Sequence, residues 1–258
     1  MQRRPDSHKG DNGKVAIIGG SSFQHGAPIF SALAAEASGV DLIFLALPKI
    51  HQDIARMQSL NFQVHPFHGD ELATEDLGPL TEMLATVDVA VIGPGLSRTS
   101  GALKLIRTLI ESAPCPLVLD ASALQDWTLT AAEGKTAVVT PHLGELERMG
   151  LVPAQIPDVA KKHGVVVHLK GHTDRITNTD GATVEVKGGN AGLTVGGTGD
   201  ALAGLIAGLI AQQVAPAEAC VTASEVIKRA GTILFETKGY GYTTREVIEG
   251  IPRVLKVL

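Results

Sequence analysis

The feature that most constrains this chain is a glycine-dense loop followed at once by an apolar, helix-forming stretch. It reads GGNAGLTVGGTGDALAGLIAGLIAQ and spans residues 188–212. Backbone near Gly197 and Gly199 can approach an anion closely because glycine has no Cβ. We expect a helix to begin at about Thr198, so the free N–H groups and the positive dipole end of its first turn point into the loop. The sequence therefore predicts an anion site here, with a phosphate as its occupant.

Asp200 falls within the first turn of that predicted helix. A carboxylate there would repel a phosphate, so we expect it to take a proton from a hydroxyl group that is about to meet the phosphate. In the alternative interpretation, Asp200 only caps the helix and the glycines only form a tight turn. The other motifs of the chain bear on this choice.

Composition limits the kind of protein and its partners. A chain of 258 residues, 44% of them hydrophobic, is long enough for one large core. The formal net charge of −5 gives no general attraction to nucleic acid or to anionic membranes. Aromatic residues make up only 3% of the chain, which argues against stacking platforms for nucleic-acid bases. We therefore expect neither nucleic acid nor a membrane as a partner.

The cysteines and the amino terminus indicate the compartment. Cys115 and Cys220 lie far apart in the sequence, a pattern typical of buried thiols in a reducing compartment. Residues 1–13 lack the apolar core of a secretory signal. The longest apolar run, residues 201–211, is too short to cross a bilayer. The sequence thus predicts a soluble, cytoplasmic protein.

Short apolar runs alternate with helical patterns along most of the chain. The runs, each typical of a buried strand, lie at residues 15–18, 41–47, 62–67, 87–92, 117–119, 137–140 and 165–169. This alternation predicts an α/β fold with a mainly parallel sheet and helices on both faces. Ligands of such sheets bind outside the carboxyl ends of the strands, so residues that follow the strands should converge on one edge. Those residues are Gly95, Asp120, His142 and Lys170.

The ends of the chain and its last third depart from this alternation. Residues 174–187 contain a Thr-Asp-Gly turn between two β-rich runs, which predicts an antiparallel hairpin appended to the parallel core. Residues 1–13 are polar and basic, and their composition predicts a mobile N-terminal segment. No repeat or low-complexity linker interrupts the remainder, so we expect a single domain over residues 14–258.

Five motifs, taken together and in order, resemble one known family. They are SHKGDNGKVAIIGGSS, AVIGPGL, VLDASAL, VVTPHLGELERM and GNAGLTVGGTGDALAGLIAGLIAQ. Each motif is weak alone, but in register they are similar to the ADP-dependent NAD(P)H-hydrate dehydratases. The likeness runs from about Ser7 to the tail at residues 239–258.

The resemblance implies a ribokinase-like fold and a repair reaction. The family restores NADH or NADPH from the S epimer of the hydrated nicotinamide nucleotide, with ADP or ATP as co-substrate and Mg²⁺ as the metal. It also implies a homo-oligomer, with a tetramer as the expected state. A separate NAD(P)H-hydrate epimerase would convert the R hydrate.

The resemblance further implies the residues of the site. Asp200 is the expected catalytic base. The expected substrate contacts are Ala27, Gly95, His142 and Asp200, and the expected nucleotide contacts are Lys170, Gly171, His172, Thr173, Asp174 and Gly199, with Gly197 and Thr198 in the anion hole.

Four of these assignments keep a simpler alternative. Lys170 could be a solvated lysine at the end of a strand. His142 could cap a turn, and Asp120 could do the same before Ala121. Glu145 would either reach the metal through water, as the one candidate metal contact, or only open the next helix.

Four positions depart from the family pattern. Ser97 stands where a third glycine is common, Ser122 replaces an aspartate, and Leu143 and Ala191 each replace a proline. Ser122 removes a charge near the expected site, but none of the four changes touches Asp200.

Two other functions stay open on the residues alone. A kinase of the same fold, acting on a vitamin-precursor alcohol, would use the same anion hole and base. A nucleotide sensor would bind without turnover. The products separate them: a kinase releases a stable phosphorylated alcohol, whereas the dehydratase releases orthophosphate and a reduced nicotinamide.

Overall fold

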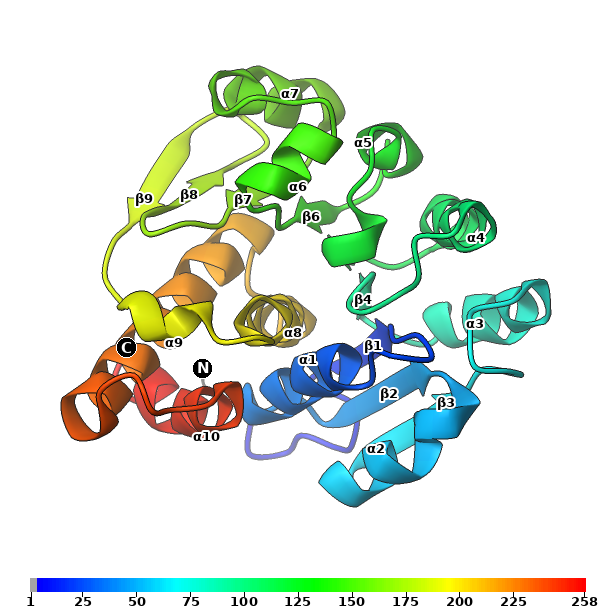
Figure 1. The fold of residues 1–258 in the computed structure, drawn as a ribbon, viewed down its shortest axis with the longest axis horizontal. Coiled ribbons are helices and arrows are strands. Elements are labelled where there is room, and N and C mark those ends of the chain that lie inside the picture. Colours follow the sequence, from blue (N-terminus) through cyan, green and yellow to red (C-terminus); the bar gives the residue numbers. More distant parts are fainter. Residues whose placement is uncertain (1–3) are drawn as a thin grey trace.

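The computed structural model describes residues 4–258 and contains one nine-stranded sheet, shown in Figure 1. The strands are β1 (Lys14–Ile18), β2 (Leu42–Leu47), β3 (Phe62–Pro66), β4 (Val89–Ile92), β5 (Leu117–Leu119), β6 (Ala137–Val139), β7 (Val166–Leu169), β8 (Asp174–Thr177) and β9 (Thr183–Val186). Their spatial order is β3-β2-β1-β4-β5-β6-β7-β8-β9. Pairing is parallel from β3 to β7 and antiparallel from β7 to β9. The predicted mainly parallel sheet with an appended hairpin is confirmed.

Helices cover both faces of the sheet (Figure 1). One face carries α1 (Gly26–Ala37), α2 (Gln52–Gln58), α8 (Thr198–Ala211), α9 (Pro216–Lys238) and α10 (Thr244–Leu255). The other carries α3 (Leu77–Leu84), α4 (Ser100–Ser112), α5 (Thr128–Ala131), α6 (Leu143–Arg148) and α7 (Ile156–His163). Short 3₁₀ turns lie between them: η1 (Lys49–His51), η2 (Thr74–Asp76), η3 (Ala121–Ala123), η4 (Pro153–Gln155) and η5 (Ala191–Thr194).

The apolar runs form strands because both of their faces are buried. In β1, Val15 and Ile17 pack into the core on one face of the sheet, and Ala16 and Ile18 pack into the core on the other. Alternate side chains of a strand point to opposite faces, so a strand covered on both sides must be apolar throughout.

Helix α8 is buried against α1, as its apolar sequence predicts. A Cβ atom at Gly204 would lie 2.0 Å from the carbonyl oxygen of Ser31, and one at Gly208 would lie 2.1 Å from Ser38 Oγ. Real Cβ atoms do not come this close, so both glycines are needed for the two helices to approach. This packing fixes the start of α8 relative to α1.

The amino-terminal segment is anchored where the structure describes it. The Asp41 carboxylate, between α1 and β2, accepts hydrogen bonds from the Gly10 and Asn12 amides at 2.9 and 3.0 Å. Residues 10–12 are therefore held against the fold, which corrects the prediction of a mobile segment for this part of it. Residues 1–3 lie outside the described part. No helix among residues 4–258 is long and apolar enough to cross a membrane.

Candidate active site

The glycine loop and α8 form the predicted helix terminus. Gly197 caps α8 with a φ of +97°, and a Cβ there would lie 2.4 Å from the ring of Phe30. Both its conformation and this close approach require glycine. The helix begins at Thr198, as predicted. The Thr198 amide donates to the carbonyl oxygen of Val195 at 3.4 Å, whereas the Gly199 and Asp200 amides of this turn make no hydrogen bond to any described residue and are available to an anion.

Asp200 is positioned through its own backbone. The Ser31 hydroxyl of α1 donates a hydrogen bond of 2.8 Å to the carbonyl oxygen of Asp200. Burial and the neighbouring charge of Asp120 raise the pKa of the Asp200 carboxyl to about 7, although Lys170 lowers it. A carboxylate with this pKa can accept a proton near neutral pH and hold it.

Lys170 forms ion pairs with Asp120 and Glu145, the two carboxylates whose charges raise the pKa of Asp200. Its Nζ lies 2.7 Å from Asp120 Oδ1 and 3.4 Å from Glu145 Oε2, and the lysine side chain is 16% exposed. Asp120 makes no helix-capping bond, and Lys170 is not a solvated lysine. Burial lowers the pKa of Lys170, but Asp120, Glu145 and Asp200 raise it further, so the ammonium stays charged.

His142 and Glu145 form a capping box at the start of α6. The Glu145 amide donates to His142 Nδ1 at 3.2 Å, and the His142 amide donates to Glu145 Oε2 at 2.9 Å. The imidazole is mostly exposed, whereas the Glu145 side chain is buried and also lies 3.8 Å from Arg148 Nη2. The predicted capping role of His142 is present, and its ring still faces the cavity.

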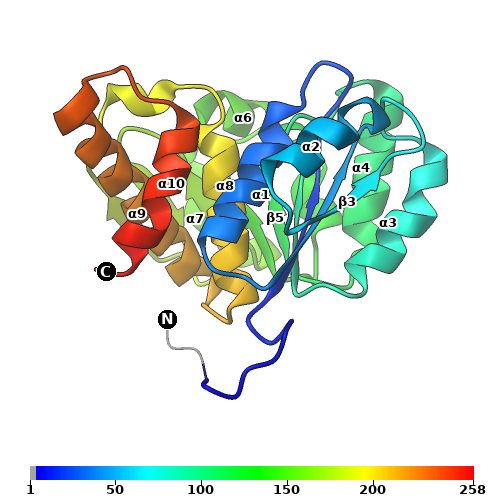
Figure 2. The same ribbon diagram turned by 90° about the horizontal axis from the view of Figure 1, so that it is seen from below.

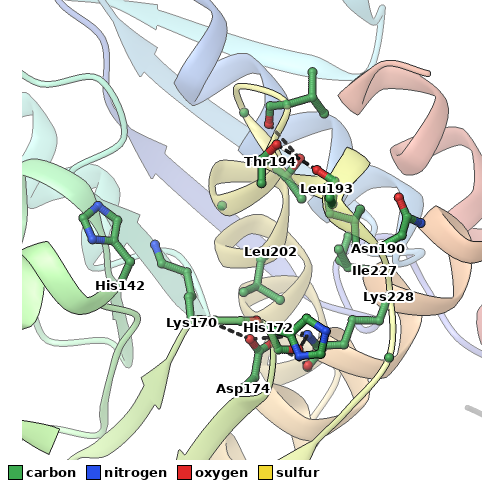
Figure 3. A pocket seen from close by; sticks show the side chains of 18 of the residues that line it. His142, Lys170, His172, Asp174, Asn190, Leu193, Thr194, Leu202, Ile227 and Lys228 are labelled. Carbon is green, nitrogen blue, oxygen red and sulfur yellow. Dashed lines mark hydrogen bonds and ion pairs between the residues drawn. The ribbon is translucent and has the colours of Figure 1, made fainter. Parts of the chain in front are cut away.

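A cavity of about 710 Å³ opens beside these groups, within the range of small-molecule sites (Figure 3). Predicted site residues that line it are His142, Lys170, Gly171, His172, Asp174, Gly197, Thr198 and Gly199. In Figure 3, His142 and Lys170 lie across the cavity from Leu193 and Thr194 of η5. Its walls are mostly apolar, with Leu202 and Ile227 among them.

Four predicted contacts lie outside the lining of this cavity: Ala27, Gly95, Thr173 and Asp200. A Cβ at Gly95 would lie 3.2 Å from Ala27 Cβ, so Ala27 and Gly95 sit together. They follow β1 and β4, where the strand order reverses and α/β sheets open a crevice. Asp200 lies in the first turn of α8, next to Gly199, which lines the cavity.

Sequence reasoning missed several residues that line the cavity. They include Asn190, Ser224, Ile227 and Lys228. Ser224 and Lys228 lie four residues apart on α9, and both are buried. A lysine in an otherwise apolar helical face was the one signal in the sequence that pointed to them.

Comparison with known proteins shows similarity to NAD(P)H-hydrate dehydratases over most of the chain. The family model described as NAD(P)H-hydrate dehydratase matches residues 15–253. A relative from Cenarchaeum symbiosum, named ADP-dependent (S)-NAD(P)H-hydrate dehydratase, is 37% identical over 265 residues, which cover 98% of this chain and 92% of the relative. The Bifunctional NAD(P)H-hydrate repair enzyme Nnr from Archaeoglobus fulgidus is 34% identical, but the match covers only 53% of its length.

Solved structures agree on the fold. A ribokinase-like superfamily protein from Enterococcus faecalis superposes with a TM-score of 0.84 at 27% identity, covering all of this chain and 91% of the other. The ADP/ATP-dependent NAD(P)H-hydrate dehydratase from Bacillus subtilis, co-crystallized with ATP and Mg²⁺, gives a TM-score of 0.85 at 24% identity, covering 99% of this chain and 94% of the other. The ribokinase-like fold is thus confirmed, and with the family match over nearly its whole length, the chain belongs to the NAD(P)H-hydrate dehydratase family.

Proposed function

We propose that this protein is an ADP- or ATP-dependent (S)-NAD(P)H-hydrate dehydratase in which Asp200 is the catalytic base. The observation that carries the proposal is the position of this carboxylate. It stands in the first turn of α8, beside the free Gly199 amide and the partly buried ammonium of Lys170, with a pKa of about 7. A base and an anion site in one helical turn suit the transfer of a phosphoryl group to a hydroxyl.

The chemistry follows from the poor leaving ability of hydroxide. Asp200 takes the proton of the C6 hydroxyl while the hydroxyl oxygen bonds to the terminal phosphorus of the nucleotide. The bond between that phosphorus and the bridging oxygen breaks. The ring nitrogen lone pair then expels the phosphate, and loss of a proton from C5 restores the double bond. The products are NAD(P)H, orthophosphate and the shortened nucleotide.

Other residues bind the reactants. The amides of Gly197, Gly199 and Asp200 stabilise the migrating phosphoryl group, and each well-placed donor contributes about 3 kcal/mol. Thr198 lines the same cavity. Lys170, with Gly171, His172 and Thr173 of the following turn, binds the nucleotide. Ala27, Gly95 and His142 bind the hydrated dinucleotide on the other side of Asp200.

Mg²⁺ would enter with the nucleotide. In phosphoryl-transfer enzymes one or two carboxylates and the phosphates of the substrate bind Mg²⁺, and the ion neutralises the polyphosphate charge. Glu145 would contact Mg²⁺ only through water, because its carboxylate is buried and its Oε2 lies 3.4 Å from Lys170 Nζ.

The setting of the enzyme follows from the same proposal. We infer that residues 14–258 act as one domain, that the protein is a cytoplasmic homo-oligomer, with a tetramer as the expected state, and that a separate epimerase supplies the S hydrate. Two buried free thiols, Cys115 and Cys220, support a reducing compartment. Relatives that are bifunctional repair enzymes support a partner activity, since this chain matches about half of their length.

The test is recovery of NADH. Purified protein incubated with hydrated NADH, Mg²⁺ and ADP or ATP should regain the near-ultraviolet absorbance of NADH and release orthophosphate. Asp200→Asn should keep nucleotide binding and lose about 10²–10⁴-fold in turnover. Phosphorylation of an alcohol without recovery of NADH would favour the kinase, and full activity of Asp200→Asn would remove the base.

A further inference from the structure

Two side chains of α9 hold the turn between β7 and β8 from behind. Lys228 Nζ donates hydrogen bonds to the carbonyl oxygens of Gly171 at 3.3 Å and His172 at 3.0 Å. Ser224, one helical turn earlier, donates from Oγ to Asp174 Oδ2 at 2.6 Å. Residues four apart lie on the same face of a helix, so both reach the turn together. Figure 3 shows Lys228 approaching His172 from the α9 side of the cavity.

The Asp174 carboxylate is surrounded by groups of the protein. Its Oδ1 accepts a hydrogen bond from the Gly171 amide at 2.8 Å and lies 3.6 Å from Lys228 Nζ. Its Oδ2 accepts a hydrogen bond from Ser224 Oγ at 2.6 Å and lies 3.2 Å from His168 Nε2. Each oxygen thus accepts one hydrogen bond from the protein and has a basic side chain beside it. Burial alone would raise the pKa of Asp174, but His168, Ser224 and Gly171 lower it to about 2, so the charge persists.

Burying the Lys228 ammonium costs free energy unless it is paired and hydrogen-bonded. Lysine is among the residues least often buried, and the Lys228 side chain is only 9% exposed. Here one ammonium satisfies two backbone carbonyls and balances the Asp174 charge. Without it, the carbonyls lose their donor and a buried carboxylate loses its counter-ion. These contacts therefore fix the shape of the turn between β7 and β8.

We propose that Lys228, Ser224 and Asp174, here called the α9 clamp, are positioning residues for the nucleotide. They hold the turn of residues 170–173 in the shape that binds it. This rests on the proposed function, in which that turn contacts ADP or ATP. In this view Asp174 serves the site through the Gly171 amide and not by touching the nucleotide, and nucleotide affinity depends on a helix that follows the catalytic loop in sequence.

The test replaces the lysine and separates binding from chemistry. Lys228→Met keeps much of the length and loses the charge. The dissociation constant of ADP with Mg²⁺, measured by titration calorimetry, should rise about tenfold, because the turn must be ordered on binding. At saturating nucleotide, kcat should stay within about twofold and KM for the hydrate should not change, because Asp200 and its side of the site are untouched. The matched control is Lys238→Met on the same helix, whose exposed lysine pairs with Glu246 of α10.

Each result has one meaning. Equal ADP affinity in Lys228→Met and the wild type would overturn the clamp, as would an equal loss in Lys238→Met. If Lys228→Met does not fold, Ser224→Ala decides, since it removes one hydrogen bond and should weaken ADP binding about threefold. Unchanged affinity in that variant would overturn the clamp. Failure of the wild type to bind ADP would instead remove the proposed function, and the clamp with it.

Discussion

Among single residues, Asp200 combines catalysis with a cost in stability. Its pKa in the folded protein is about 7, against an ordinary value of 3.8. The folded state therefore holds this proton more tightly than the unfolded state does. The resulting stabilisation is complete below pH 3.8, is lost as the pH rises through 7, and leaves a buried charge at higher pH.

Asp200→Asn should therefore stabilise the protein in base. At pH 8 the substitution removes the buried charge, and we expect an increase in the free energy of unfolding on the order of 2 kcal/mol. At pH 4 the wild-type carboxyl is protonated in the folded state, and the difference should nearly vanish. Thermal unfolding of both proteins at the two pH values measures this. A lower Tm for the variant at pH 8 would contradict the assignment of a raised pKa.

Asp120 should influence the same titration from a distance. Its charge is the largest electrostatic contribution that raises the pKa of Asp200, and it also holds Lys170. Asp120→Asn should lower the pKa of Asp200, so the acid limb of the pH profile of kcat/KM should move below pH 7. The control is Asp126→Asn, an exposed carboxylate six residues later. An acid limb that stays in place would show that Asp120 does not act on the base.

At the level of elements, the strands and the hairpin were predictable because local patterns determine them. A strand covered on both faces must be apolar throughout, which is how residues 15–18 and 117–119 stand out. The Thr-Asp-Gly turn marks the hairpin of β8 and β9. The helices α5 and α6, of 4 and 6 residues, are too short to show a helical period, so they depend on tertiary packing.

The site was predictable where one segment carries it and where the carboxyl ends of parallel strands converge. The start of α8 and the position of Asp200 follow from the glycine loop alone, and the convergence of strand ends predicts that Asp120 and Lys170 lie at the same side of the sheet. The ion pair itself, between residues 50 apart, is not contained in the sequence. The orientation of Asp174 depends on Ser224, another 50 residues away. No local pattern contains such contacts, because they arise from the order of strands in the sheet and the place of α9 beside it.

The contact between α1 and α8 should be intolerant of any side chain at position 204. In Gly204→Ala the new methyl group would overlap the Ser31 carbonyl, and we expect a loss of at least about 2 kcal/mol in the free energy of unfolding. Gly101→Ala on α4 is the control, because its Cβ would meet nothing within 4 Å. Chemical denaturation of both variants measures the difference. Equal stability of the two would show that α1 and α8 separate easily.

In the molecule as a whole, the site lies at the carboxyl ends of the strands, and the chain ends lie toward the opposite side. Figure 2 shows both marked ends at the edge where β1 begins, opposite the loops that follow the strands. The proposed nucleotide contacts come from the turn after β7 and from the start of α8, segments that are separate in sequence. Ligand binding should therefore stabilise the global fold rather than one loop.

ADP with Mg²⁺ should raise the Tm of the whole protein. At a concentration 100 times the dissociation constant, binding adds about 2.7 kcal/mol to the free energy of unfolding. For a chain of this length that is a shift of about 5–10 °C in one transition. Calorimetric scans with ADP, with adenosine and with no ligand measure it, and adenosine should shift the Tm far less because it has no phosphate for the α8 amides. Two separate transitions, only one of them moved by ADP, would contradict a shared core.

The tight contact at Gly204 and the bond from Ser31 to Asp200 have a consequence for how this protein can vary. The proton acceptor is tied to the close packing of α8 against α1, so mutations that loosen this packing will misplace Asp200. The turn that faces the nucleotide is held by a different helix, through the buried Ser224 and Lys228 of α9. A selection for new phosphate donors would then change α9 and the turn after β7, while positions 204 and 208 stayed glycine.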